Sequence, residues 1–179
     1  MFLTRRTSRK RRVLLALLAA ILCFAVTNLV LASTAHAAGG SEITNGYNGK
    51  CLDADTSTIG QNGTYVQLWD CSDPYNPNAN QAWYTQNCDF WGNCEIVNAA
   101  SGRCLDADAP GVNNNGDKVQ LWDCWNGANQ RWSTNNGHFV NQASGKCLDA
   151  DLGGINNNGD KVQLWDCWNG ANQNWYWSF

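Results

Sequence analysis

Short stretches of alternating apolar and polar residues recur along the chain and predict β-strands. In the segment 66–69 (VQLW), side chains point to opposite faces in turn. Val66 and Leu68 therefore share one face, which we assign to the core, and Gln67 and Trp69 share the other. Asn and Gly are abundant between such stretches and helix formers are scarce, so the sequence predicts an all-β protein.

The same segments occur three times. A Gly-Lys/Arg-Cys-Leu-Asp-Ala-Asp motif lies at 49–55, 102–108 and 145–151, and Gln-Leu-Trp-Asp-Cys lies at 67–71, 120–124 and 163–167. Asn-Gln-x-Trp follows at 80–83, 129–132 and 172–175. The period is 43 residues between the second and third copies and 53 between the first and second. Such a period indicates repeated β-units, and three are too few for the usual propeller of four or more blades.

The first 37 residues have the pattern of a bacterial export signal. They hold six basic residues and no acidic one, and they include an unbroken apolar run of 14 residues over 13–26. That run is shorter than the ~20 residues needed to cross a bilayer. Ala35 and Ala37 are the small residues that a signal peptidase reads, so we expect cleavage near Ala37. The export route, general or twin-arginine, stays open.

The remainder is one acidic, secreted domain over 38–179, with repeats at approximately 41–85, 86–134 and 135–179. Its 142 residues carry six Lys and Arg and all 15 acidic residues, a formal charge of −9. This charge excludes a basic nucleic-acid binder and a protein held electrostatically on anionic membranes. A chain of this length forms one domain and leaves no room for a catalytic domain beside a second module.

Eight cysteines follow the signal, an even number that predicts disulfides in an exported chain. Three pairs are each 20 residues apart and the remaining two cysteines are six apart, which predicts Cys51–Cys71, Cys104–Cys124, Cys147–Cys167 and Cys88–Cys94. Zinc is disfavoured because there is no Cys-x-x-Cys pair and only His138 follows the signal. The stretch from Asp106 to Gly111 lacks the terminal Glu of a calcium loop, so we expect no metal and no cofactor.

These repeated motifs resemble the ricin-B-type lectins and the related xylan-binding modules. The resemblance covers roughly residues 41–179 and rests on nine motif copies in register with three equally spaced Cys pairs. It implies a β-trefoil of twelve strands, four in each repeat of ~43 residues, around a pseudo-threefold axis. Each of the three disulfides that close about 20 residues would contribute about 3 kcal/mol by constraining the unfolded chain.

The resemblance also implies three sugar sites. Each contains the Asp after Cys-Leu, the Trp of Gln-Leu-Trp and the Asn before Gln-x-Trp. A carboxylate accepts charge-assisted bonds from hydroxyls, an indole packs on the apolar face of a pyranose, and an amide both donates and accepts. The sites are alpha (Asp53, Trp69, Asn80), beta (Asp106, Trp122, Asn129) and gamma (Asp149, Trp165, Asn172). Supporting glutamines, bonded to backbone or to the Asp, are Gln81, Gln130 and Gln173.

Two features bear on the geometry of these sites. If Cys51 lies opposite Cys71 in an antiparallel pair, Asp53 lies directly opposite Trp69, about 5 Å away at Cβ. The same register pairs Asp106 with Trp122 and Asp149 with Trp165. The departure from the family pattern is a four-residue insertion before Asn80, which could displace that amide and makes the alpha site the least certain of the three.

The other aromatic and acidic residues of the motifs have structural interpretations. Trp83, Trp132 and Trp175 are expected in the core, and Asp55, Asp108 and Asp151 are expected to cap turns. Trp125 and Trp168 either extend a stacking surface or pack, with no preference. Trp91 is interpreted as an exposed loop aromatic and His138 as a strand-end residue.

The sequence therefore predicts a monomeric, non-catalytic and multivalent lectin for galactose-type sugars or xylan- or arabinan-type polysaccharide. Glycoside hydrolysis needs an acid and a base with different pKa values, whereas three near-copies of one carboxylate share similar surroundings. A glycoside hydrolase is therefore the weaker alternative, and a protein-binding trefoil such as a protease inhibitor is the other. The sequence does not specify which sugar is bound.

Overall fold

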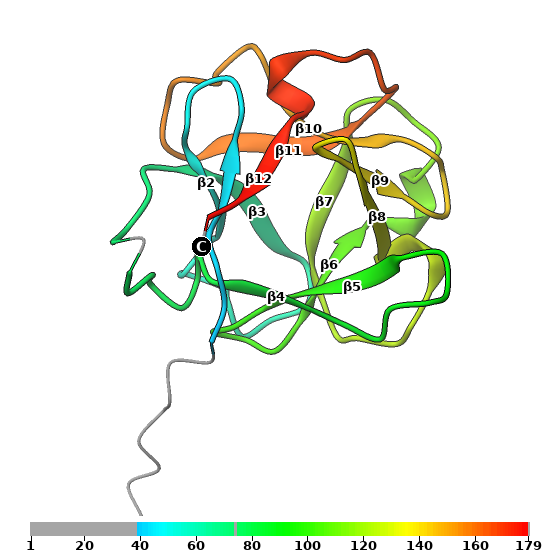
Figure 1. Ribbon diagram of the computed structural model, residues 1–179, viewed down its shortest axis with the longest axis horizontal. Coiled ribbons are helices and arrows are strands. Elements are labelled where there is room, and N and C mark those ends of the chain that lie inside the picture. The colour runs from blue at the N-terminus through cyan, green and yellow to red at the C-terminus, as the bar shows by residue number, and fades with distance from the viewer. Residues whose placement is uncertain (1–38, 74, 179) are drawn as a thin grey trace, which may run out of the picture. The chain divides into compact units, whose positions relative to one another are not determined.

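The computed structural model describes residues 39–73 and 75–178 (Figure 1). The predicted signal peptide lies outside these residues. Within the described part, no helix has the length and apolar character that crossing a membrane requires. The chain there is built from short strands and single turns of 3-10 helix, as the turn-rich composition predicts.

Each repeat contributes four strands. The first repeat supplies β1 (Ile43–Asn45), β2 (Cys51–Ala54), β3 (Thr64–Trp69) and β4 (Trp83–Gln86). The second supplies β5 (Asn93–Asn98), β6 (Cys104–Ala107), β7 (Asp117–Trp122) and β8 (Arg131–Asn135). The third supplies β9 (His138–Asn141), β10 (Cys147–Ala150), β11 (Asp160–Trp165) and β12 (Trp175–Trp177). Three 3-10 turns complete the elements: η1 (Ala109–Gly111), η2 (Ala128–Gln130) and η3 (Ala171–Gln173).

Three hairpins, β2–β3, β6–β7 and β10–β11, close on one another in a ring. β3 pairs with β7, β7 with β11, and β11 with β3, all antiparallel. A glycine before the third strand of each repeat supports this ring. Gly63, Gly116 and Gly159 have φ of +90°, +83° and +85° and donate to Leu121, Leu164 and Leu68 of a neighbouring repeat, each at 2.8 Å. Such φ values favour glycine, which explains the Asn-Gly pair at each turn.

The remaining six strands form a second closed ring. β4 pairs with β5, β8 with β9, and β12 with β1, so the first and last strands of the domain lie side by side. The pairing β5–β8 and the bridges Ser41–Trp83 and His138–Asn174 join these pairs into a barrel. Three copies of one four-strand unit around two rings make the β-trefoil that the resemblance implied.

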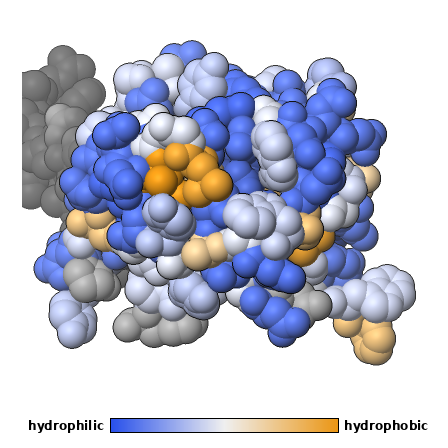
Figure 2. All heavy atoms as spheres, turned by 90° about the horizontal axis from the view of Figure 1, so that it is seen from above, coloured by the Kyte–Doolittle hydropathy of each residue, from blue (hydrophilic) through white to orange (hydrophobic). Residues whose placement is uncertain are grey.

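The core is filled by the side chains that the alternating pattern predicted to face inward. Val66 and Leu68 are buried, whereas Gln67 is partly exposed and Trp69 is exposed. The predicted core tryptophans Trp83, Trp132 and Trp175 are almost fully buried, and their indole N–H groups donate to Leu52, Leu105 and Leu148 carbonyls at 2.9 Å. The face shown in Figure 2 is mostly hydrophilic with small hydrophobic patches, as expected when apolar side chains turn inward.

All four predicted disulfides are present, but the predicted strand register is wrong. The bridges are Cys51–Cys71, Cys88–Cys94, Cys104–Cys124 and Cys147–Cys167. Cys51 lies opposite Trp69 and not opposite Cys71, so Asp53 lies opposite Gln67. Because β3 ends at Trp69, the chain can bend afterwards and bring the Cys71 Cα within 5.0 Å of the Cys51 Cα. The other hairpins have the same two-residue shift, with Asp106 opposite Gln120 and Asp149 opposite Gln163.

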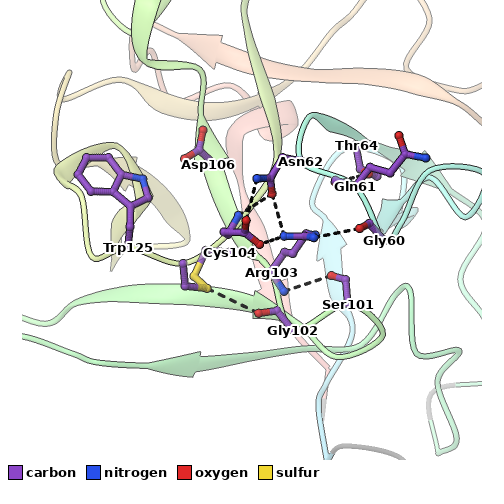
Figure 3. A network of polar contacts seen from close by, with 12 residues as sticks. Gly60, Gln61, Asn62, Thr64, Ser101, Gly102, Arg103, Cys104, Asp106 and Trp125 are labelled. Atoms are coloured by element: carbon purple, nitrogen blue, oxygen red, sulfur yellow. Dashed lines mark hydrogen bonds and ion pairs between the residues drawn. A yellow bond between two sulfur atoms is a disulfide. The ribbon is translucent and has the colours of Figure 1, made fainter.

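Polar contacts next to these disulfides join successive repeats. Arg103 forms an ion pair with Asp123. It also donates to Asn62 at 2.8 Å and to the Gly60 carbonyl at 2.9 Å (Figure 3). Lys146 with Asp166 and Asn115, and Lys50 with Asp70 and Asn158, repeat this contact around the axis. The three contacts form a cycle, so each repeat is held by both neighbours.

Candidate functional site

Each predicted site aspartate lies in the second strand of its repeat and lines a surface hollow. Asp53, Asp106 and Asp149 are 3–4% exposed. The hollows measure about 390, 360 and 250 Å³, and each contains the Asp, Trp and Asn of one predicted site. The structure therefore brings together the alpha, beta and gamma sets that the sequence predicted.

Three amide donors hold each carboxylate. In the alpha site, Gln67 Nε2 donates to one Asp53 oxygen at 3.1 Å, while Asn80 Nδ2 and Gln81 Nε2 donate to the other at 2.7 and 2.9 Å. The beta and gamma sites repeat this arrangement at 2.8–3.2 Å. A carboxylate has roughly four lone-pair positions, so about one remains for a ligand hydroxyl.

The supporting glutamines act as expected, through both the carboxylate and the backbone. Gln81 Nε2 also donates to the Asp70 carbonyl at 3.0 Å, and Gln81 Oε1 accepts from Ser72 N at 2.9 Å. Gln130 and Gln173 make the matching bonds. The sequence interpretation missed a second set of glutamines that contact the aspartates: Gln67, Gln120 and Gln163. Their position on the same strand face as the site tryptophans was the available signal.

The insertion in the first repeat does not displace Asn80. Its Nδ2 donates to Asp53 at 2.7 Å and to the Ala54 carbonyl at 3.3 Å, as Asn129 and Asn172 do to their own partners. Both amide hydrogens of each site asparagine are thus donated to protein. The amide expected to donate and accept at the sugar rim therefore has only its oxygen left to accept, and in Asn172 that oxygen is buried without a bonded donor.

A buried asparagine of a neighbouring repeat holds the backbone carbonyl of each site asparagine. The buried Asn98 Nδ2 donates to the Asn80 carbonyl at 2.9 Å. Asn141 donates in the same way to Asn129, and Asn45 to Asn172. Each site is therefore a rigid unit shared by two repeats.

Burial raises the pKa of Asp53, Asp106 and Asp149 above the ordinary aspartate value. Desolvation is the largest cause in each, and the amide donors act against it. Asp55 and Asp108 add a smaller rise to the pKa of Asp53 and Asp106, whereas Trp168 opposes the rise at Asp149. A buried carboxylate gains its proton at a higher pH than an exposed one because burial disfavours its charged form.

This shift predicts that acid releases a bound sugar before it unfolds the domain. Binding that needs the carboxylate is complete above the folded-state pKa and is lost as the pH falls through it, at a pH above about 3.9. The protonated aspartates do not destabilise the fold, because a pKa raised in the folded state favours proton uptake there. Calorimetric titrations between pH 7 and pH 4, with tryptophan fluorescence as the folding control, test this. Undiminished affinity down to pH 4 would contradict it.

The site tryptophans are the exposed partners of the buried aspartates. Trp69, Trp122 and Trp165 are 43%, 40% and 40% exposed. With the observed register, each lies diagonally from its aspartate, about 7–8 Å away at Cα on the same sheet face. The diagonal leaves more room between ring and carboxylate than the direct pairing that the sequence predicted.

The beta and gamma sites each have a second exposed indole. Trp125 lines the beta hollow and Trp168 the gamma hollow. Each ring lies over a glycine two residues later, where an added Cβ would come within 2.2–2.3 Å of ring atoms. The alpha site has Ser72 in this place, and its hydroxyl donates to Glu42 at 2.7 Å. Of the two interpretations of Trp125 and Trp168, an exposed surface at the sites or packing, the structure favours the exposed surface.

The remaining predicted residues are placed as follows. Asp55 caps a turn by accepting from Ser57 N at 2.9 Å, and Asp151 accepts from Gly153 N at 3.4 Å. Asp108 precedes η1 and makes no cap bond there. Trp91 is an exposed loop aromatic, in edge contact with Phe90, and His138 begins β9.

Acidic groups do approach cysteine sulfurs at two places among the described residues. The groupings are Glu42 with Cys51 and Cys71, and Glu95 with Cys104 and Cys124. Since these cysteines are paired in disulfides, they provide no thiolate for a metal. A further hollow of about 440 Å³ is lined by Trp83, Trp132 and Trp177. No site aspartate contributes to its lining.

Comparison with known proteins agrees with this geometry. Residues 39–175 match the model of the ricin-type beta-trefoil lectin domain. No curated protein matches the chain. Among solved structures, the designed threefold-symmetric protein ThreeFoil is 24% identical with a TM-score of 0.68, covering 78% of this chain and 97% of that one.

Two natural proteins are also similar in structure. The C-terminal half of an earthworm R-type lectin, solved in complex with GalNAc, is 21% identical with a TM-score of 0.58, covering 77% of this chain and 96% of that chain. An exo-β-1,3-galactanase from Clostridium thermocellum is 25% identical with a TM-score of 0.67, covering 78% of this chain. The likeness spans only 30% of the galactanase.

Proposed function

Because the chain belongs to the ricin-type β-trefoil lectin domain family, we propose that it is a secreted, non-catalytic and multivalent carbohydrate-binding protein. Family membership and the lectins of similar structure support carbohydrate binding by the domain. The observation that carries the proposal is the threefold repetition of one arrangement, in which a buried carboxylate and an amide oxygen lie in a hollow with an exposed indole.

The chemistry of this arrangement suits a pyranose. The free lone pair of Asp53 and the Asn80 oxygen accept from ring hydroxyls, and the second hydrogen of Gln67 Nε2 donates to them. The Trp69 indole covers the apolar face of the sugar and removes it from water. In the beta site, Asp106, Asn129 and Trp122 take these roles, while Gln120 Nε2 donates to both Asp106 and Asp108. In the gamma site, Asp149, Gln163 and Trp165 take them, while the Asn172 oxygen is buried without a bonded donor.

We propose galactose-type sugars or xylan- or arabinan-type polysaccharide as ligands. The earthworm lectin binds GalNAc, and the galactanase acts on a galactan, which favours the galactose type. Three sites on one rigid body allow one polymer to occupy two of them, so the second contact becomes intramolecular.

Hydrolysis is not supported by the three carboxylates. Burial shifts the pKa of all three in the same direction, whereas glycoside hydrolysis needs an acid and a base whose pKa values differ. The similar galactanase is a much longer protein, so its activity does not transfer to a chain that matches 30% of it.

Co-sedimentation with insoluble polysaccharide, combined with a reducing-end assay, tests the proposal. The purified domain should be retained on galactan, arabinogalactan or xylan and should release no reducing ends. Free sugar should compete, which separates lectin binding from adsorption. Release of reducing ends that disappears in an Asp106→Ala variant would overturn the non-catalytic assignment, and failure to bind any glycan on an array would overturn the function.

The second indoles should distinguish the sites. Trp125→Ala and Trp168→Ala are each expected to weaken one site about fivefold, since losing roughly 40 Å² of apolar sugar contact costs about 1 kcal/mol. Both rings are more than half exposed, so the stability of the fold should be unaffected. Trp91→Ala, which truncates an exposed indole that lines none of the three hollows, is the control. Calorimetry with unchanged affinities in both tryptophan variants would show that these rings do not touch the sugar.

A further inference from the structure

A second kind of hollow lies on the third repeat and shares no lining residue with the alpha, beta and gamma hollows. It measures about 390 Å³ and is lined by the Cys147–Cys167 disulfide, His138 and Val140, and by three asparagines, Asn136, Asn169 and Asn174. None of these residues belongs to the gamma set. The other two repeats show what this place normally contains.

In the first and second repeats, a buried glutamate carboxylate occupies the corresponding place. The repeats align at Asn45, Asn98 and Asn141, so Glu42, Glu95 and His138 occupy equivalent positions three residues earlier. Glu42 and Glu95 are 2% and 0% exposed, and each has a carboxylate oxygen within 4.8 Å of both sulfurs of its disulfide. His138 therefore replaces a carboxylate beside the third disulfide.

Defined donors hold the carboxylate in the second repeat. Glu95 accepts from the Asn126 backbone N–H at 2.9 Å, from Asn87 Nδ2 at 2.7 Å and from Gln86 Nε2 at 3.1 Å. Such an array of neutral N–H groups is what a buried carboxylate needs, because it satisfies the oxygens without a cation.

Two of these donors recur in the third repeat with the same backbone geometry. Asn169 corresponds to Asn126, with φ of 61° against 64°, and Asn136 corresponds to Asn87, with φ of 50° against 49°. Both line the hollow. The Asn169 N–H, unlike that of Asn126, has no bonded acceptor among the described residues.

The remaining substitutions make space. Asn174 stands where the second repeat has Arg131, whose guanidinium bonds to Asn87, Asn93 and Asn126. His138 Nδ1 lies 3.1 Å from the Gln173 carbonyl, which fixes the hydrogen on Nδ1 and leaves Nε2 without a protein partner in the described part of the chain. The donors are thus retained while the internal carboxylate is lost.

We propose that this hollow binds the carboxylate of an acidic sugar, a uronic acid unit, in the place that Glu42 and Glu95 fill in the other repeats. That the carboxylate belongs to a sugar rests on the proposed function. The carboxylate itself follows from the donors around Asn169 and Asn136. The site would let the protein select polysaccharides that carry uronic acid groups beside their neutral units.

Nuclear magnetic resonance of the backbone amides tests the proposal, with Asn169 as the local reporter. The Asp149→Asn variant, in which the gamma site is disabled, is titrated with glucuronic acid, with glucose as the neutral match and with acetate as the free carboxylate. Glucuronic acid should shift the Asn169 amide with a Kd on the order of millimolar, and glucose should not. Equal shifts with glucose would overturn the carboxylate site, and acetate binding as tightly as glucuronic acid would overturn its assignment to a sugar acid.

The matched variant supplies the missing carboxylate from the protein. His138→Glu should abolish the response to glucuronic acid, because its own carboxylate bonds to Asn169 as Glu95 bonds to Asn126. The fold accepts glutamate at this position in two repeats, and His138→Gln, which adds no charge, should keep the response. Undiminished glucuronic acid binding in His138→Glu would refute the proposal. Binding of a neutral sugar at the alpha and beta sites is followed through the backbone amides of those two sites. A failure of the proposed function would appear there, separately from the response of the Asn169 amide.

Discussion

The triple variant Trp69→Ala, Trp122→Ala, Trp165→Ala is expected to lose retention on polysaccharide while remaining folded. Each indole is at least 40% exposed and lies at the end of its strand, outside the buried core. Removing it exposes the apolar face of the sugar to water and leaves the core intact. The effect should therefore fall on binding and not on the free energy of unfolding.

The size of the loss follows from valency. A single site of this kind is expected to bind a simple sugar at about 1 mM, or about −4 kcal/mol. A polymer that spans two sites gains a factor of roughly 10²–10⁴ over one site. Variants with one or two rings removed should fall in graded steps, and the triple variant should lose the whole gain together with the single-site affinity.

The matched control is Trp91→Ala, because Trp91 is an 81% exposed indole on a loop that lines none of the three hollows. It should bind polysaccharide as the unaltered protein does. Affinity electrophoresis in gels containing the polysaccharide provides the measurement. Normal retention of the triple variant would place the sugar elsewhere, and a loss in Trp91→Ala would indicate adsorption through exposed aromatic rings.

The aspartates require a more careful test than the sequence suggested. Asp53→Ala removes the acceptor of three amide donors as well as a contact to the sugar. Each unsatisfied buried donor costs about 1–3 kcal/mol, so a triple aspartate variant would lose stability together with binding. Single variants, which should each lower the calorimetric sugar stoichiometry by about one, remain informative when their unfolding is measured in parallel.

Much of the architecture could be predicted because it depends on local pattern. Alternation in 66–69 fixed which side chains face the core, and equal spacing identified the disulfide partners. The strand register could not be predicted, because the bridge was assumed to join residues directly opposite each other. The bend after Trp69 that allows a diagonal bridge is a property of the folded backbone.

The grouping of the candidate residues in three hollows was predicted more fully than their bonding. The sequence identified Asp53, Trp69 and Asn80, but not that Gln67 lies opposite Asp53 or that Asn80 donates both amide hydrogens inward. The insertion before Asn80 could have moved it, but the bonds from Asn80 to Asp53 and Ala54 hold the asparagine, and Tyr75 in the insertion is 94% exposed. These features depend on contacts between distant segments, which no short motif specifies.

Trp132 connects the core to the beta site, and its truncation should lower the free energy of unfolding more than truncation of any exposed residue. Its side chain is fully buried, and its indole donates to the carbonyl of Leu105, the residue immediately before Asp106. Trp132→Ala is expected to lower the free energy of unfolding by about 3–5 kcal/mol, the usual cost of truncating a large core aromatic.

Trp132→Phe separates the two contributions of this side chain. Phenylalanine keeps most of the apolar contact but leaves the buried Leu105 carbonyl without its donor, so the expected loss is about 1–3 kcal/mol. Guanidinium unfolding with the disulfides intact measures both variants, and Trp122→Ala, which truncates an exposed indole, should be close to neutral. If Trp132→Phe unfolded like the unaltered protein, the indole bond to Leu105 would not stabilise the fold. The Gln-x-Trp motif would then anchor the Asp106 strand through apolar packing alone.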